Sequence, residues 1–239
     1  MKLLQAFALA WNMLTIIPFL KVHHFYKGIN ALSAMMYPFV GFIIGFVIYM
    51  VSQGFEDVLP HDVLHVSCFF LLVVITGGIH LDGFSDTIDG LFVAKDKALQ
   101  VMKDSHVGGM GMIFSVSFLI LKATLFFSLE QLSVLIPILT LSRMGIVVII
   151  YKFRYISSGI GELIKEELSP LHVNVALFFG FCISMFYGVV WAFILVLLYM
   201  LIVSQMFQRR YGGLNGDIYG FLIESSEVVL LFIAVLAGF

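Results

Sequence analysis

The chain consists of long apolar runs separated by short polar segments. About seven runs approach the roughly 20 residues that a helix needs to cross a bilayer core. These runs are residues 31–51, 61–79, 110–129, 133–151, 171–188, 189–207 and 218–239. The pattern predicts an all-α fold, a polytopic transmembrane helical bundle formed by one integral-membrane catalytic domain, residues 1–239.

A further apolar piece, residues 3–19, precedes these runs. Trp11 and Asn12 interrupt it, and no small-residue cleavage pattern follows Pro18. A secretory signal peptide normally has such a cleavage site. We therefore expect this piece to be retained as an interfacial or re-entrant helix.

Composition agrees with a membrane protein. Apolar residues make up 61% of the chain, against roughly 45–50% in soluble domains, and the mean hydropathy is +1.07. A net charge of −2 offers no basic surface for nucleic acid, so we expect no nucleic-acid partner. Cys68 and Cys182 both lie inside apolar runs, where cysteine behaves as a small apolar residue.

The basic residues alternate between the polar segments. Nearly all lie in residues 20–30, 80–109, 152–170 and 208–217, whereas residues 52–60, 130–132 and 187–190 contain none. Short cytoplasmic loops carry the excess of Lys and Arg. We therefore expect an integral protein of the cytoplasmic (inner) membrane, with the first group of segments in the cytoplasm.

One cytoplasmic segment carries three carboxylates, Asp82, Asp86 and Asp89. On a helix they point to roughly 0°, 40° and 340°, so they share one face. Three adjacent negative charges repel one another and raise each other's pKa. A divalent cation would relieve this repulsion, and Mg²⁺ prefers carboxylate oxygens. His80 lies about 160° from Asp82, which favours a substrate or indirect contact over ligation.

Two glycine-rich segments lie on the same predicted side. The first contains Lys103, Asp104, Ser105, His106 and Gly108, and the second contains Gly213, Asn215, Gly216 and Asp217. Backbone amides at a helix start can bind phosphate. For the first segment, a flexible loop that merely joins two helices is the favoured alternative. For Asp217, a helix N-cap is an equal alternative.

Ionisable residues inside apolar runs also need partners. Arg143 either forms an ion pair that fixes two helices or contacts a phosphate through its planar donor group. Lys122 could extend toward an interface. Glu224 and Glu227 begin the last apolar run, and such a carboxylate usually faces a cavity or a partner.

Together these features favour metal-assisted phosphoryl transfer at a membrane surface. The chain has no P-loop, so we expect no ATPase. A cation-coupled transporter is an alternative, since intramembrane carboxylates also form ion pathways. The carboxylates gather on one side, however, and not at the midplane.

The segment from Gly77 to Gly90 resembles the signature of the cobalamin synthases, the adenosylcobinamide-GDP ribazoletransferases. Further matching segments follow the family's order along nearly the whole chain. They are Tyr37 to Gly41 with Gly45, Met102 to Gly108, Ser142 with Arg143, and Gly212 to Asp217 with Glu224 and Glu227. Two positions depart from the family pattern: His106 replaces an arginine, and Asn215 replaces a threonine.

The resemblance implies a Mg²⁺-dependent reaction. In it α-ribazole, or its 5′-phosphate, attacks the cobinamide-proximal phosphorus of adenosylcobinamide-GDP, giving adenosylcobalamin or its 5′-phosphate and GMP. Asp82, Asp86 and Asp89 would bind one or two Mg²⁺ ions. Asp104 or Asp217 would complete the metal shell or accept the ribazole proton.

The remaining expected substrate contacts include two phosphate-neutralising cations. These contacts are His80, Lys103, Ser105, His106, Gly108, Arg143, Gly213, Asn215, Gly216, Glu224 and Glu227. The CDP-alcohol phosphotransferases use a related metal motif, but the arginine of that motif is missing after Gly83. The expected partners are the two substrates and the lipid bilayer, and self-association into a homo-oligomer is left open.

Overall fold

The computed structural model describes residues 2–22, 25–104 and 106–239, and these residues fold as a helical bundle. The helices are α1 (Lys2–Leu14), α2 (Ile29–Met35), α3 (Tyr37–Phe55), α4 (His61–Thr76), α5 (Ile79–Leu91), α6 (Lys95–Val101), α7 (Gly109–Phe127), η1 (Leu132–Val134), α8 (Leu135–Lys152), α9 (Ile160–Glu167), α10 (Pro170–Phe186), α11 (Val190–Tyr211) and α12 (Gly216–Leu236). The predicted all-α bundle is confirmed.

Within the described residues, five helical segments are long and apolar enough to cross a membrane: Tyr37–Phe55, Gly109–Phe127, Leu132–Lys152, Val190–Tyr211 and Gly216–Leu236. The number rises to seven if two bent helix pairs each count as one span. Helices α4 and α5 meet at 81°, and α9 and α10 meet at 98°. The expected number of about seven spans thus lies at the upper end of what the structure offers.

The prediction for residues 31–51 is wrong at its start. The chain breaks at Met36, where α2 ends and α3 begins, and Pro38 lies in the first turn of α3. Proline fits a first turn because its missing N–H would have no helical partner there. Hydropathy continues across this break, so the apolar pattern alone merged the two helices.

The N-terminal helix is also shorter than the apolar piece at 3–19, because α1 ends at Leu14. The Trp11 indole N–H donates to the Ile17 carbonyl at 3.0 Å, and the Asn12 amide donates to the Leu20 carbonyl at 3.2 Å. The two polar residues that interrupt the run therefore hold the following segment against α1.

Helix α8 lies at the centre of the bundle, and most of its residues are buried. Helix α3 approaches it closely through Gly41 and Gly45. A Cβ atom on Gly45 would lie 2.7 Å from the Cα of Ile136. Small residues at this spacing let helix backbones pack tightly in membranes.

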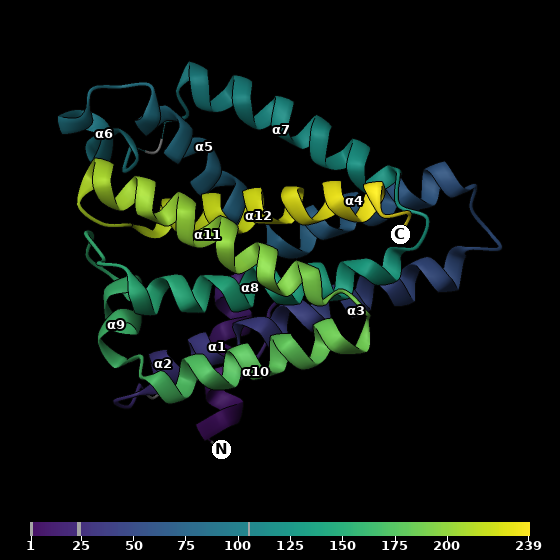
Figure 1. The fold of residues 1–239 in the computed structure, drawn as a ribbon, viewed down its shortest axis with the longest axis horizontal. Helices are drawn as coiled ribbons and strands as arrows, with labels where there is room; N and C mark the ends of the chain where they lie inside the picture. Colours follow the sequence, from purple (N-terminus) through teal and green to yellow (C-terminus); the bar gives the residue numbers. More distant parts are fainter. Residues whose placement is uncertain (1, 23–24, 105) are drawn as a thin grey trace.

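Figure 1 shows α2, α6, α9 and the turn between α11 and α12 at one end of the bundle, and the C-terminus at the other. The basic segments therefore gather at one end of the molecule, as the loop charges predict. Helix α5 carries the predicted aspartate face toward this same end.

Candidate functional site

The aspartate segment is helical, as its spacing predicts. Gly77 and Gly78 separate α4 from α5 with φ values of +62° and +66°. Glycine adopts this left-handed conformation without the steric cost that other residues incur. The two glycines turn the chain so that α5 runs beside the first half of α12.

The backbones of α5 and α12 touch where Gly83 meets Gly220. A Cβ atom on Gly83 would lie 2.9 Å from the Asp217 carbonyl oxygen, and one on Gly220 would lie 2.8 Å from the His80 carbonyl oxygen. This close approach brings Asp217 to the aspartate face. The charge of Asp86 interacts with those of Asp82, Asp89 and Asp217.

We call Asp82, Asp86 and Asp217 the carboxylate cluster. Asp82 is exposed, whereas Asp86 and Asp217 are partly buried. Asp82 also faces an open groove of about 580 Å³ between α5 and α7. Lys103 lies close enough to interact with the charge of Asp217. The site therefore combines acidic oxygens with one nearby cation at the basic end of the bundle.

Asn215, and not Asp217, caps α12. The Asn215 side-chain oxygen accepts a hydrogen bond from the Ile218 N–H at 3.0 Å, and its amide nitrogen donates to an Asp217 carboxylate oxygen at 2.7 Å. The N-cap alternative for Asp217 is therefore wrong. Asn215 orients Asp217 and leaves that carboxylate beside Asp82 and Asp86.

Asp89 forms two bonds that the sequence did not predict. Its carboxylate oxygens accept hydrogen bonds from the Gly108 and Gly111 N–H groups, each at 2.7 Å. Asp89 thus holds the N-terminus of α7 from outside the helix, and the negative charge is favourable there. The Gly108 amide, a predicted substrate contact, is therefore already paired with Asp89. Each Asp89 oxygen keeps a second lone pair.

We predict that Gly111→Ala weakens this contact. A Cβ atom on Gly111 would overlap the Asp89 carboxylate and lie 2.6 Å from the Ser85 hydroxyl oxygen. The substitution should lower the free energy of unfolding by about 1–3 kcal/mol, measured as thermal stability in detergent. Gly109→Ala is the matched control, since no atom lies within 4 Å of its Cβ position. Equal stability of the two variants would contradict the prediction.

In the loop before α7, Asp104 is paired with a neighbouring histidine, unlike the acidic residues of the carboxylate cluster. Asp104 is exposed and accepts hydrogen bonds from the His106 backbone N–H at 3.0 Å and the His106 ring at 2.8 Å. These hydrogen bonds lower the pKa of Asp104. The structure therefore pairs Asp104 with His106 at the surface. Ser105, a predicted substrate contact, lies outside the described residues.

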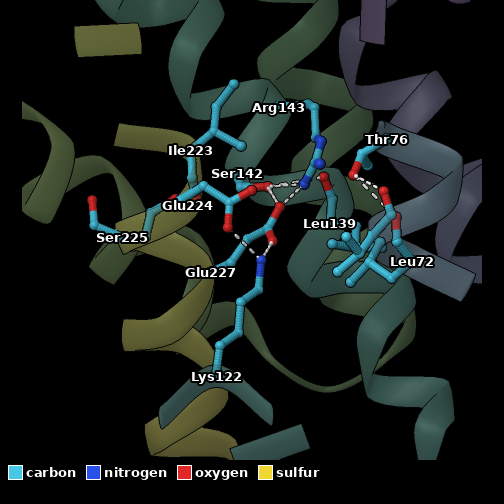
Figure 2. Close-up of polar contacts among 12 residues, drawn as sticks. Leu72, Thr76, Lys122, Leu139, Ser142, Arg143, Ile223, Glu224, Ser225 and Glu227 are labelled. Atoms are coloured by element: carbon cyan, nitrogen blue, oxygen red, sulfur yellow. Dashed lines mark hydrogen bonds and ion pairs between the residues drawn. The ribbon is translucent and has the colours of Figure 1, made fainter. Parts of the chain in front are cut away.

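A buried ionic cluster joins α7, α8 and α12 (Figure 2). The Lys122 ammonium lies 2.6 Å from a carboxylate oxygen of Glu224 and 2.6 Å from one of Glu227. The Arg143 guanidinium pairs with the other Glu227 oxygen, and the Ser142 hydroxyl lies 3.3 Å from that oxygen. Two cations thus balance two anions.

The ionic cluster assigns partners to residues that the sequence left open. Arg143 is 1% exposed and forms an ion pair with Glu227, the first of its two predicted roles. Lys122 is 5% exposed, so the expectation that it extends toward an interface is wrong. The sequence held a signal for this pairing, because the interiors of the apolar runs, away from their ends, contain two cations and two carboxylates. Substrate contact by Arg143, Glu224 and Glu227 stays a prediction.

Three more predicted substrate contacts, His80, Gly213 and Gly216, lie in other surroundings. His80 is buried on another face of α5 and lines a cavity with Tyr219. Gly213 is buried in a turn whose backbone pairs with residues 154–156, and its Cβ position is 2.6 Å from the Arg154 carbonyl oxygen. Gly216 is exposed and lines the same cavity as His80.

The donor set suits a hard divalent cation, although the side chains do not enclose one as they stand. In the described part of the chain, no group of three His, Cys, Asp or Glu side chains is arranged to hold a metal ion. The charge of Asp86 nevertheless interacts with those of Asp82 and Asp217, and among the described residues none of these three carboxylates forms an ion pair like those of the ionic cluster. Such oxygens are the ligands that Mg²⁺ prefers.

The fold and the site define a helical bundle of the membrane type with a carboxylate cluster at one end. The chain belongs to the cobalamin-5-phosphate synthase family, whose model matches residues 6–235.

Relatives named adenosylcobinamide-GDP ribazoletransferase cover most of the chain. The protein from Brevibacillus brevis is 34% identical over 85% of this chain and 87% of its own. The one from Desulfitobacterium hafniense is 34% identical over 83% and 84%, and that from Desulforamulus reducens is 29% identical over 95% of each. No solved structure matches the chain.

Proposed function

We propose that this protein transfers the adenosylcobinamide-phosphate group of adenosylcobinamide-GDP to α-ribazole or its 5′-phosphate. The products are adenosylcobalamin, or its 5′-phosphate, and GMP. Family membership and the relatives' name support the reaction. The structural observation that carries the proposal is the meeting of Asp217 with Asp82 and Asp86 where Gly83 and Gly220 touch.

Mg²⁺ is the proposed cofactor, and Asp82, Asp86 and Asp217 would hold it. Asp89 remains a candidate ligand through its free lone pairs. When bound, the metal neutralises charge on the diphosphate and on the departing phosphate oxygen. Their mutual repulsion makes these carboxylates receptive to a cation, because a positive charge lowers the cost of ionising all of them.

The remaining chemistry falls to side chains around the carboxylate cluster. An acceptor hydroxyl oxygen bonds to phosphorus, the bond from phosphorus to the GMP oxygen breaks, and the hydroxyl proton passes to a carboxylate. Asp217 suits that role better than Asp104, since it belongs to the carboxylate cluster and Asn215 fixes its orientation. Lys103 would offset phosphate charge beside Asp217.

We also propose the cytoplasmic membrane as the location, with the carboxylate cluster facing the cytoplasm. The gathering of basic segments at one end of the bundle supports this orientation (Figure 1). A cytoplasmic site would give the polar, nucleotide-bearing donor access from water. Self-association remains a separate prediction.

The reaction is tested with membranes that contain the chain. Adenosylcobinamide-GDP and α-ribazole should yield a corrinoid product and GMP in equal amounts with Mg²⁺, and neither product with EDTA. Membranes without the chain are the control. No GMP with Mg²⁺, together with activity on CDP-diacylglycerol and an alcohol, would favour the CDP-alcohol phosphotransferases. Metal-independent solute flux without GMP would favour a transporter.

A further inference from the structure

A separate cavity of about 160 Å³ lies on the His80 side of α5. Its walls come from several helices and from the segment after α8, and they include Tyr155, Tyr219, Ile146 and Ile150. Gly216 also lines it, next in sequence to Asp217. We call this space the tyrosine cavity. It is mostly apolar, and it reaches the first residue of α12 beside the carboxylate cluster.

Two buried polar side chains, His80 and Tyr219, line its wall. His80 is 6% exposed and Tyr219 is 8% exposed. Among the described residues, neither the Nδ1 atom of His80 nor the Tyr219 hydroxyl has a hydrogen-bond partner. A buried polar group without a partner is unfavourable, so each is a candidate to bind a ligand.

Aromatic rings form one side of the tyrosine cavity. The rings of Tyr155 and Tyr219 are nearly parallel, with centroids 5.8 Å apart and an angle of 28° between their planes. The Tyr155 ring lies against Gly161, whose Cβ position is 2.6 Å from that ring. Such a wall suits a flat aromatic ligand, because aromatic side chains stack on heterocyclic bases.

We propose that the tyrosine cavity binds the base of the acceptor nucleoside. This inference rests on the proposed function. The base of α-ribazole is a dimethylbenzimidazole, a flat two-ring system with methyl groups on its edge and one free ring nitrogen. Its methyl groups match the apolar wall. Its ring nitrogen accepts a hydrogen bond, and the Tyr219 hydroxyl can donate one. The ribose then extends past Gly216 toward Asp217.

Guanine, the base of the nucleotide that the donor carries, matches the tyrosine cavity poorly. Its N–H groups need hydrogen-bond acceptors such as carboxylate or amide oxygens. None of the described side chains that line this cavity is a carboxylate or an amide. The lining of the cavity therefore suits the acceptor base better than the guanine of the donor.

The test compares steady-state kinetics of wild type, Tyr219→Phe and Tyr155→Ala in membranes with Mg²⁺. Tyr219→Phe should raise the KM for α-ribazole roughly three- to ten-fold, the effect of one lost hydrogen bond. Tyr155→Ala should raise it roughly ten-fold through lost stacking. The KM for adenosylcobinamide-GDP should stay within two-fold, about the precision of such a comparison. Tyr187→Phe, at the other end of the bundle, is the matched control.

A second acceptor separates direct contact from a structural effect. The riboside of dimethylindole has the shape of α-ribazole without the accepting ring nitrogen. Wild type should bind this analogue more weakly than α-ribazole, whereas Tyr219→Phe should bind the two equally. The inference would be overturned if wild type and Tyr219→Phe showed the same preference for α-ribazole over the analogue. It would also be overturned if the substitutions raised only the KM for adenosylcobinamide-GDP. Absence of GMP from wild type would instead contradict the proposed reaction.

Discussion

Asp86→Asn is expected to abolish GMP release, lowering kcat by a factor of about 10² to 10⁴, while the protein still folds and inserts into membranes. Asp86 is the member of the carboxylate cluster whose charge interacts with Asp82, Asp89 and Asp217 together. The amide preserves the shape of the side chain but removes a negative charge and an anionic ligand oxygen. The loss should therefore concern chemistry and not folding.

Thermal denaturation in detergent, with and without Mg²⁺, makes this prediction specific. Without metal, Asp86→Asn should be at least as stable as wild type, because one source of repulsion is gone. Saturating Mg²⁺ should stabilise wild type, by about 2.7 kcal/mol at a hundredfold excess over Kd, and leave the variant unchanged. Asp96→Asn, on exposed α6, is the control. Full activity of Asp86→Asn would exclude it from the site.

Lys122→Met is expected to lower the free energy of unfolding by about 3–5 kcal/mol. Lys122 contacts both Glu224 and Glu227, and all three side chains are buried (Figure 2). Removing the ammonium leaves two carboxylates facing a single cation, Arg143. Burying an uncompensated charge costs far more than an exposed salt bridge contributes.

The double variant Lys122→Met/Glu224→Gln supplies the control. It restores equal numbers of cations and anions, so it should be more stable than Lys122→Met alone. The measurement is the midpoint of thermal unfolding of each purified variant in detergent. A loss below about 1 kcal/mol for Lys122→Met, the range of exposed ion pairs, would show that water reaches the ionic cluster.

Hydropathy and spacing predicted the helical bundle and the aspartate face of α5, because both depend on local periodicity. The break at Met36 escaped prediction because α2 and α3 are both apolar. The end of α1 could not be predicted for a different reason. Whether Trp11 and Asn12 continue a helix or bind the next segment depends on where that segment returns.

The candidate site was predictable as a set of residue types but not as an arrangement. Asp217 was recognised as a candidate, yet only the contact of Gly83 with Gly220 shows which helix it joins. The hydrogen bonds of Asp89 to the start of α7 could not be predicted, because their donors are backbone amides, which the sequence does not distinguish. The partners of Lys122 could not be predicted either. A balance of charges in the apolar runs predicts ion pairs, but it does not say which helices meet.

The central claim is that the carboxylate cluster holds the metal and the diphosphate of the donor. An experimental structure with adenosylcobinamide-GDP and Mn²⁺ in place of Mg²⁺ tests it most directly, because anomalous scattering locates Mn²⁺ without reference to the protein. We predict a metal signal in contact with Asp82, Asp86 and Asp217, with the diphosphate bound to the same ion. A metal or diphosphate bound elsewhere, such as at Lys122 and Arg143, would contradict the claim.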